Sequence, residues 1–331
     1  MSSKGRIVAV TGAGGFIGSH LVEALVAEGS RVRALVHYNA EGSIGSLRYV
    51  DQRTLDAIEI VAADVRDPYA MRSLVRGAET VFHLAALIGI PYSYIAPASY
   101  VETNVGGTLN LLEAARSEGV ERLVVTSTSE TYGTAQYTPI DEVHPAVAQS
   151  PYAATKVGAD QLALSYYRSF NTPVCVVRPF NTFGPRQSER AIIPTIVSQA
   201  LRNTEALRLG SLEPRRDLLY VTDTVNGFLL LAGRAEAIGR AVNLGTGTSY
   251  SVRELIETVS RVLGRELRVV QDSARIRPDR SEVMELRADG SVARALGWVP
   301  KVSLEEGLRH VVDFMSRLTT DSGTKPTGYR V

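Results

Sequence analysis

A tyrosine and a lysine one helical turn apart, Tyr152 and Lys156, could carry out proton transfer. A free phenol has a pKa of about 10, so a tyrosine that acts as a base near neutrality needs that pKa lowered by roughly three units, or about 4 kcal/mol. The ammonium of Lys156 can supply part of this shift from the same helix face. A Tyr-x-x-x-Lys pair alone is also common on ordinary helix surfaces, so its meaning depends on the rest of the chain.

A glycine-rich turn near the start of the chain supplies the second clue. Gly12, Gly15 and Gly18 separate an apolar run at residues 6–10 from a helical pattern that begins near Phe16 and Ile17. Such a turn lets backbone N–H groups approach a pyrophosphate at a helix N-terminus, although glycine-rich turns also serve packing alone. Together with the downstream tyrosine, lysine and Ser/Thr-rich segment, this turn predicts nicotinamide redox chemistry.

The elements that must position these residues alternate between short β-branched runs and longer helical patterns. This alternation predicts an α/β fold, a Rossmann-type doubly wound parallel sheet with helices on both faces and a smaller C-terminal substrate-binding lobe. The expected strands lie at residues 7–10, 32–36, 58–62, 80–84, 123–126 and 174–177. The expected helices lie at residues 19–28, 68–76, 106–118 and 152–170.

The alternation loosens after residue 178, where glycine and proline become frequent. We therefore expect a cofactor-binding domain at residues 1–178 plus about 218–246, and a second lobe at residues 179–217 and 247–318. A helix capped by Ser251, with Glu254 at the capping-box position, is expected in this lobe. The polar segment 319–331 is expected to be disordered.

The composition limits the classes of partner. The chain has 331 residues, 44% of them hydrophobic, which suffices for a sizeable core. Its 36 basic and 35 acidic residues leave a net charge of +1, so we expect no partner that is a nucleic acid or a membrane. The single cysteine, Cys175, lies in an apolar run and is expected to be a buried thiol. One cysteine and the lack of a signal or membrane-length segment favour the cytoplasm.

The second expected strand ends without the acidic residue that usually binds the adenosine ribose. No cluster of basic residues that could bind a 2′-phosphate follows this strand, so we expect NAD as the cofactor, and NADP stays open. Asn39 is a candidate partner for the ribose. Asp64, followed by Val65, could accept a hydrogen bond from the adenine amino group, or could simply cap a turn. Asp67 before Pro68 is better explained as a helix cap. No metal site is expected, because His37 has no second ligand at useful spacing.

The chain resembles the extended short-chain dehydrogenases, a family of NAD-dependent nucleotide-sugar epimerases, dehydratases and decarboxylases. The resemblance covers about residues 5–315. The matching motifs lie, in order, at residues 11–18, 83–86, 126–133, 150–156, 178–185 and 216–221. In the second motif the small residues after His83, namely Leu84, Ala85 and Ala86, would let the cofactor pass close.

The resemblance implies roles for the catalytic residues. Tyr152 would be the base, Lys156 would bind the nicotinamide ribose, and Thr128 would hydrogen-bond the reacting sugar hydroxyl. Glu130 would remove a carbon-bound proton in a 4,6-dehydratase, a step that a simple 4-epimerase does not need. Many dehydratases of the family place an aspartic acid before this glutamate, whereas this chain has Ser129. GDP-mannose dehydratases and UDP-glucuronate decarboxylases share that serine.

We therefore expect a 4,6-dehydratase (a lyase), closest in look to the bacterial enzymes that act on UDP-N-acetylglucosamine or a related UDP-hexose. A UDP-sugar 4-epimerase and a UDP-glucuronate decarboxylase remain the alternatives, and a non-catalytic NAD-binding regulator is the least favoured. The resemblance places Asn181, Arg216 and Arg280 at the diphosphate, with Arg277 as a nearby alternative to Arg280. It also places Ile193 beside the base and implies a homodimer.

Overall fold

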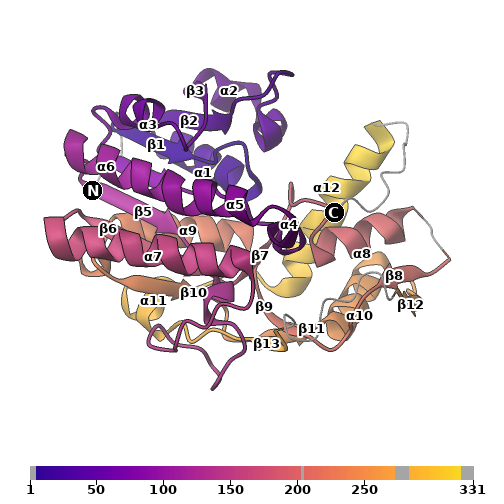
Figure 1. Ribbon diagram of the computed structural model, residues 1–331. Coiled ribbons are helices and arrows are strands. Elements are labelled where there is room, and N and C mark those ends of the chain that lie inside the picture. The colour runs from indigo at the N-terminus through magenta and orange to yellow at the C-terminus, as the bar shows by residue number, and fades with distance from the viewer. Residues whose placement is uncertain (1–4, 203–204, 273–282, 322–331) are drawn as a thin grey trace.

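The computed structural model describes residues 5–202, 205–272 and 283–321 (Figure 1). Its centre is a seven-stranded sheet in the order β10-β6-β5-β4-β1-β2-β3. Every neighbouring pair in this sheet is parallel. Its strands are β1 (Ile7–Thr11), β2 (Arg31–His37), β3 (Ile58–Ala63), β4 (Thr80–His83), β5 (Arg122–Thr126), β6 (Val174–Pro179) and β10 (Ala241–Leu244).

Helices cover both faces of the sheet, because the strands carry apolar side chains on both sides. On one face, Leu21 of α1 and Phe228 of α9 pack in a cluster with Val10 of β1. On the other face, Leu74 of α3 packs in a second cluster with Ala9 of the same strand. Figure 1 shows α6 and α7 side by side in front of the sheet. These helices are α1 (Phe16–Ala27), α3 (Pro68–Val75), α6 (Gly107–Glu118), α7 (Pro151–Phe170) and α9 (Val221–Ala232).

The C-terminal lobe has its own core, built mainly by three helices. Ile196 of α8, Val259 of α10 and Leu308 of α12 are all buried in it. A second sheet has the order β11-β9-β13, with β7 paired to β9, and β12 pairs with β8. The elements are β7 (Asn181–Phe183), α8 (Ile192–Leu201), β8 (Leu207–Leu209), β9 (Arg215–Tyr220), β11 (Ser249–Ser251), α10 (Val252–Leu263), β12 (Val269–Gln271), β13 (Glu285–Leu286) and α12 (Leu304–Asp321).

Short helical turns complete the described chain. The residues before α6 form a π-helical turn at Val101–Gly106. The other short helices are α2 (Gln52–Asp56), α4 (Ile90–Ile95), α5 (Pro97–Tyr100) and α11 (Ser291–Ala295). Turns of 3₁₀ helix lie at Gly45–Tyr49, Ser129–Tyr132 and Ala235–Ala237.

The predicted Rossmann-type fold is confirmed, and most predicted strands agree within two residues at either end. The capping box at Ser251 and Glu254 is present, with both reciprocal hydrogen bonds. Asp67 caps α3 by accepting from two backbone N–H groups, with Pro68 at the first helical position. The prediction for the last segment is wrong at residues 319–321, which continue α12, while residues 322–331 lie outside the described chain.

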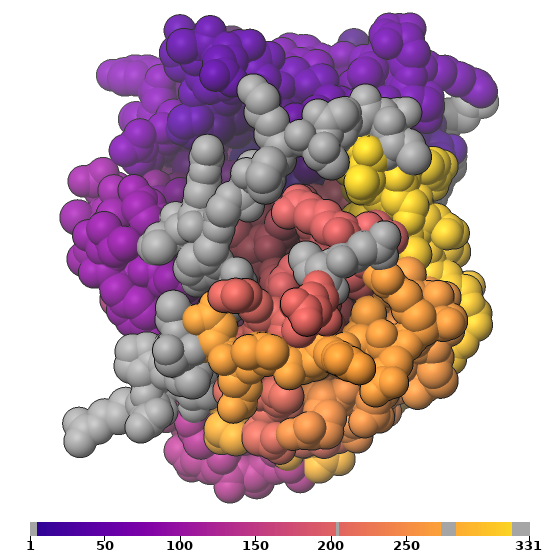
Figure 2. All heavy atoms as spheres, turned by 90° about the vertical axis from the view of Figure 1, so that its right-hand side faces the viewer, coloured from indigo at the N-terminus to yellow at the C-terminus, as the bar shows by residue number. Residues whose placement is uncertain are grey.

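The two halves of the chain meet over the carboxyl ends of the parallel strands. Figure 2 shows this side, with the indigo-to-magenta N-terminal half next to the orange and yellow C-terminal lobe and red segments between them. β1 pairs with β2 on one side and β4 on the other, so the strand order reverses at β1. In open α/β sheets such a reversal places a ligand crevice at the strand ends. None of the helices among the described residues has the length and apolar character to cross a membrane.

Candidate active site

The glycine turn is packed too closely for a side chain at Gly12. Gly12 has a φ of +70°, in the left-handed region that favours glycine. A Cβ atom there would lie 2.7 Å from the Ala85 nitrogen, so β1 and the segment after β4 touch backbone to backbone. Gly15 is the N-cap of α1 and supplies no side-chain cap, while Phe16 and Ile17 open the helix. This cradle of backbone at a helix N-terminus fits the pyrophosphate of a dinucleotide.

Leu84 and Ala85 are held to the end of β1. Their backbone N–H groups both donate to the Thr11 hydroxyl at 3.2 Å, and the Leu84 N–H also donates to the Thr11 carbonyl. Ala86 continues this half-buried segment. Leu84 and Ala85 therefore lie against the glycine turn, and the close passage of the cofactor along this segment stays a prediction.

Asp64 directly follows β3, which is an edge strand of the central sheet. Its carboxylate accepts from the Arg66 backbone and guanidinium, and this contact is the main cause that lowers the pKa of Asp64. A groove of about 610 Å³ is lined by Asp64, Arg66, Asp67, Glu102, Gly106 and Asn110. Val65 is 5% exposed and packs in the core, so only its backbone can reach a ligand.

Asn39 is a turn-forming residue in this structure. Its amide nitrogen donates to the carbonyl groups of His37 and Ser43, and its amide oxygen accepts from the Ser43 N–H. Both amide hydrogens are therefore engaged within the loop, whereas the amide oxygen has a second lone pair that can accept from a ribose hydroxyl, so the ribose contact stays a prediction. The His37 Nε2 lies 3.5 Å from a carboxylate oxygen of Asp64. No group of three potential metal ligands occurs within the described ranges.

The predicted catalytic side chains converge at the carboxyl end of β5. Thr128 begins the 3₁₀ turn that carries Glu130, whose N–H donates to the Thr128 hydroxyl at 3.2 Å. Tyr152 lies in the first turn of α7, behind the N-cap Ser150. A hydrogen bond joins Thr128 to the Tyr152 phenol, and the Glu130 charge acts on the same group. Three residues from two separate elements thus form one cluster.

The pKa of Tyr152 is raised in the protein alone, which differs from the expected depression. Burial is the largest cause, and the negative charges of Glu130 and Asp160 add to it. The hydrogen bond from Thr128 works in the opposite direction. Lys156 is only 4% exposed, and its ammonium donates to the Thr126 carbonyl at 2.6 Å. Burial lowers the pKa of Lys156, against the opposing effect of Asp160.

A buried ion pair lies beneath this cluster and was not predicted. One carboxylate oxygen of Asp160 accepts from Ser127 at 2.8 Å and from Arg178 at 3.0 Å. Arg178 also donates to the Tyr132 hydroxyl at 3.0 Å. Asp160 follows Lys156 by one helical turn, a spacing visible in the sequence, but its partner lies on a different strand.

The predicted substrate residues are only partly brought together. Asn181 opens β7, and its amide oxygen is buried without a hydrogen-bond partner among the described residues. Arg216 on β9 donates to the Val283 carbonyl at 2.7 Å. The prediction for Ile193 is not supported, because its side chain is 1% exposed in the core of the C-terminal lobe. Arg280 and its alternative Arg277 lie outside the described residues.

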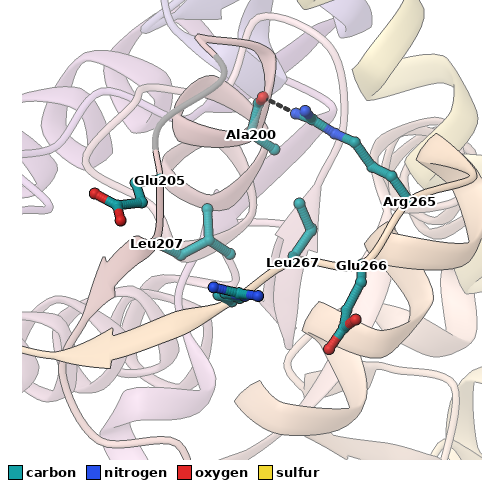
Figure 3. Close-up of a pocket in the computed structure, with 7 residues that line it drawn as sticks. Ala200, Glu205, Leu207, Arg265, Glu266 and Leu267 are labelled. Atoms are coloured by element: carbon teal, nitrogen blue, oxygen red, sulfur yellow. Dashed lines mark hydrogen bonds between the residues drawn. The ribbon is translucent and has the colours of Figure 1, made fainter.

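A separate small pocket in the C-terminal lobe contains none of the predicted site residues (Figure 3). It has a volume of about 170 Å³ and lies between α8, β8 and the segment that precedes β12. The Arg265 guanidinium reaches across it to the Ala200 carbonyl. Its lining residues are Ala200, Glu205, Leu207, Arg265, Glu266, Leu267 and Arg268.

Comparison with known proteins adds to this geometry. The sequence model of the family described as GDP-mannose 4,6 dehydratase matches residues 9–311. A UDP-glucose 4-epimerase of Mycolicibacterium smegmatis is 37% identical over 92% of this chain and 97% of the relative. A dTDP-glucose 4,6-dehydratase of Actinoplanes is 32% identical over 92% of this chain and 96% of the relative.

Solved structures are similar over nearly the whole chain. The crystal structure of the dTDP-glucose 4,6-dehydratase of Streptomyces venezuelae, which has NAD bound, superimposes with a TM-score of 0.85. It is 30% identical in sequence, with 95% of this chain and 98% of that chain covered. The similar proteins include epimerases and dehydratases, so the likeness alone does not choose between these reactions.

Proposed function

Since the chain belongs to the GDP-mannose 4,6-dehydratase family of nucleotide-sugar enzymes, we propose that it is a NAD-dependent nucleotide-sugar 4,6-dehydratase. We further propose UDP-N-acetylglucosamine or a related UDP-hexose as its substrate. The similar structure with bound NAD and the glycine cradle at α1 both support NAD as the cofactor.

The observation that carries this proposal is the position of Glu130. Its half-buried carboxylate is close enough to act electrostatically on the Tyr152 phenol, and its backbone is fixed by Thr128. Oxidation at one sugar carbon and reduction on its other face, as in an epimerase, needs only Tyr152. Loss of water from the neighbouring carbons needs a second base in addition to Tyr152. Glu130 can be that base, because it brings a carboxylate next to Tyr152.

The protein groups would act on the sugar in two stages. Tyr152 takes the proton of the C4 hydroxyl, and Thr128 holds that hydroxyl in place. Bound NAD would supply a hydride acceptor and donor for the sugar, and its positive charge would favour the Tyr152 phenolate. Once C4 is a ketone, the C5 proton is acidic and Glu130 removes it. The C6 hydroxyl leaves with that proton from Glu130 as water, which forms a double bond between C5 and C6. Hydride addition at C6 and transfer of the Tyr152 proton to C5 complete the 4-keto-6-deoxy product.

The diphosphate needs local donors because the chain has almost no net charge. Arg216 lies half-buried on β9, and Asn181 lies on the paired strand β7. The unpartnered amide oxygen of Asn181 supports a ligand contact at this position, because buried polar atoms normally have a partner. We propose that both residues contact the nucleotide diphosphate.

We also propose a homodimer formed through the face of α6 and α7. Apolar side chains remain exposed there, including Leu109 at 39% and Phe170 at 52%, with Val101 at 53% just before α6. Covering such side chains in a second copy would remove apolar surface from water. Light scattering of the purified protein tests this directly, and a monomeric mass would contradict it.

Incubation with individual nucleotide sugars, followed by mass spectrometry, tests the proposed reaction. UDP-N-acetylglucosamine should give a product lighter by one water. A product with the same mass and a changed configuration at C4 would identify an epimerase instead. Loss of carbon dioxide from UDP-glucuronate, with no loss of water from any UDP-hexose, would identify a decarboxylase.

A further inference from the structure

A buried histidine connects the end of β1, next to the glycine turn, to helix α6, which packs against α7. His83, the last residue of β4, is 2% exposed. Its Nδ1 lies 2.8 Å from the Thr11 hydroxyl, at the end of β1. Its Nε2 lies 3.0 Å from the Thr108 hydroxyl, in α6. The proposed reaction assigns no role to this imidazole.

The hydrogen bonds of the two threonines define one tautomer of His83. Thr11 already accepts from the Leu84 and Ala85 N–H groups, so its hydroxyl hydrogen points to Nδ1. Thr108 donates its own hydrogen to the Asn104 carbonyl at 2.6 Å, so it must accept from Nε2. Both ends therefore require a neutral ring with its hydrogen on Nε2.

The chain of hydrogen bonds continues from Thr108 to the catalytic helix. Asn104 lies in the π-helical turn before α6 and donates from its amide to the Thr155 hydroxyl at 3.0 Å. Thr155 in turn donates to the Tyr152 carbonyl at 2.7 Å. The Asn104 amide also holds both the N–H and the carbonyl of Leu87, just beyond the segment packed on Gly12.

The surroundings favour the neutral ring for a second reason. Burial, together with the nearby charge of Lys156, lowers the pKa of His83 to about 3. A proton on Nδ1 would also face a Thr11 oxygen whose acceptor positions are filled. A lysine at this position would place a second cation beside Lys156, whereas an uncharged imidazole bridges two hydroxyls without that cost.

We propose that His83 is a positioning residue that holds the glycine turn and the first turn of α7 in fixed relation through the chain Thr11, His83, Thr108, Asn104, Thr155. The role rests on the proposed function only in that the two turns bind NAD and carry Tyr152. The two ring nitrogens would then have different roles. Nδ1 would position the glycine turn that binds NAD, and Nε2 would position the helix that carries Tyr152.

Two substitutions of His83 test separately its hydrogen bond to Thr11 and its hydrogen bond to Thr108. His83→Gln places an amide near the Nε2 position and keeps the contact with Thr108, while His83→Asn keeps an acceptor near Nδ1 for Thr11. We expect His83→Gln to weaken NAD binding about tenfold with kcat nearly unchanged. We expect His83→Asn to lower kcat at saturating NAD about tenfold with NAD affinity nearly unchanged. Equal losses of both quantities in both variants would overturn the proposal.

Nitrogen-15 NMR of the wild-type imidazoles tests the chain without turnover and without any variant. His83 should show neutral Nε2–H down to about pH 4, and a charged ring or an Nδ1–H ring at pH 7 would refute the inference. His144 is a matched control, since its Nε2 accepts from the Gln136 N–H and its Nδ1 therefore donates to the Pro145 carbonyl. If no nucleotide sugar reacts with the wild-type protein, the proposed function fails while the NMR and NAD-binding results still decide this inference.

Discussion

Arg186, in the loop after β7, forms a two-pronged ion pair with Glu23 of helix α1. Its guanidinium donates to the two carboxylate oxygens at 2.6 and 2.9 Å, and also reaches the Ser19 hydroxyl. Arg186 has a φ of +70°, which costs a side-chain-bearing residue about 1–3 kcal/mol. The surrounding contacts outweigh this cost, so the loop that follows Asn181 is fixed to the helix that begins at the glycine turn.

Breaking this ion pair should destabilise the protein. Arg186→Lys keeps the charge but loses the fork that binds both oxygens, and we expect a loss of about 1–3 kcal/mol in the free energy of unfolding. Glu23→Gln should have the same sign, and the double variant should lose less than the sum. Urea unfolding measures all three. The exposed pair Arg253 and Glu213 is the control, since its removal should change stability little.

Replacing the proposed base should separate binding from chemistry. Tyr152→Phe removes one oxygen from a buried ring whose neighbours include the Tyr100 ring, 6.3 Å away. We expect turnover to fall by a factor of about 10²–10⁴ with NAD affinity within a few fold. Isothermal titration with NAD and mass spectrometry of the sugar product measure the two quantities. Unchanged turnover would remove Tyr152 from the mechanism.

Glu130 should be needed for the loss of water and dispensable for cofactor binding. Glu130→Gln keeps the size of the side chain and removes the base, so we expect dehydration to fall about a hundredfold or more. Ser129→Ala is the neighbouring control, because Ser129 carries no carboxylate and is only 3% exposed. Deuterium uptake from solvent at the sugar C5 would report on the proton removal itself. An active Glu130→Gln dehydratase would favour another base.

The lone cysteine should be unreactive in the folded protein. Cys175 is 3% exposed on β6, and burial raises the pKa of its thiol to about 12. Only a thiolate attacks common thiol reagents, so labelling should require unfolding. Rapid reaction with a disulfide reagent under native conditions would contradict the buried position. Labelling in urea supplies the positive control.

The sequence predicts those features that local periodicity and motif spacing determine. β1 to β6 and the long helices α1, α3, α6 and α7 follow from alternating apolar runs, and the cap at Ser251 follows from one short motif. The cluster of Thr128, Glu130 and Tyr152 could be predicted because each residue lies in a recognisable motif. Asp64 could be placed at the end of β3 because it directly follows an apolar run.

The features that sequence reasoning missed depend on contacts between distant segments. His83 bonds to residues 72 and 25 positions away, and no local pattern specifies either partner. Asn104 lies in a π-helical turn, which has no periodic signature of its own in the apolar pattern. Ile193 could not be assigned to core or site without the packing of α8.

Acid should unfold the wild-type protein in part through His83. Its pKa is about 3 in the folded chain against 6.5 for the free side chain, so the unfolded chain binds the proton more tightly. The stabilising effect of the neutral ring is therefore complete above pH 6.5 and declines as the pH falls toward 3. Between pH 7.5 and 5 we expect this one group to remove about 2 kcal/mol from the free energy of unfolding. His83→Asn, which cannot titrate, should show a flatter pH dependence over the same range when both proteins are unfolded in urea. Parallel curves for the two proteins would mean that His83 takes up a proton equally well in the folded and unfolded chains, against the buried neutral ring described above.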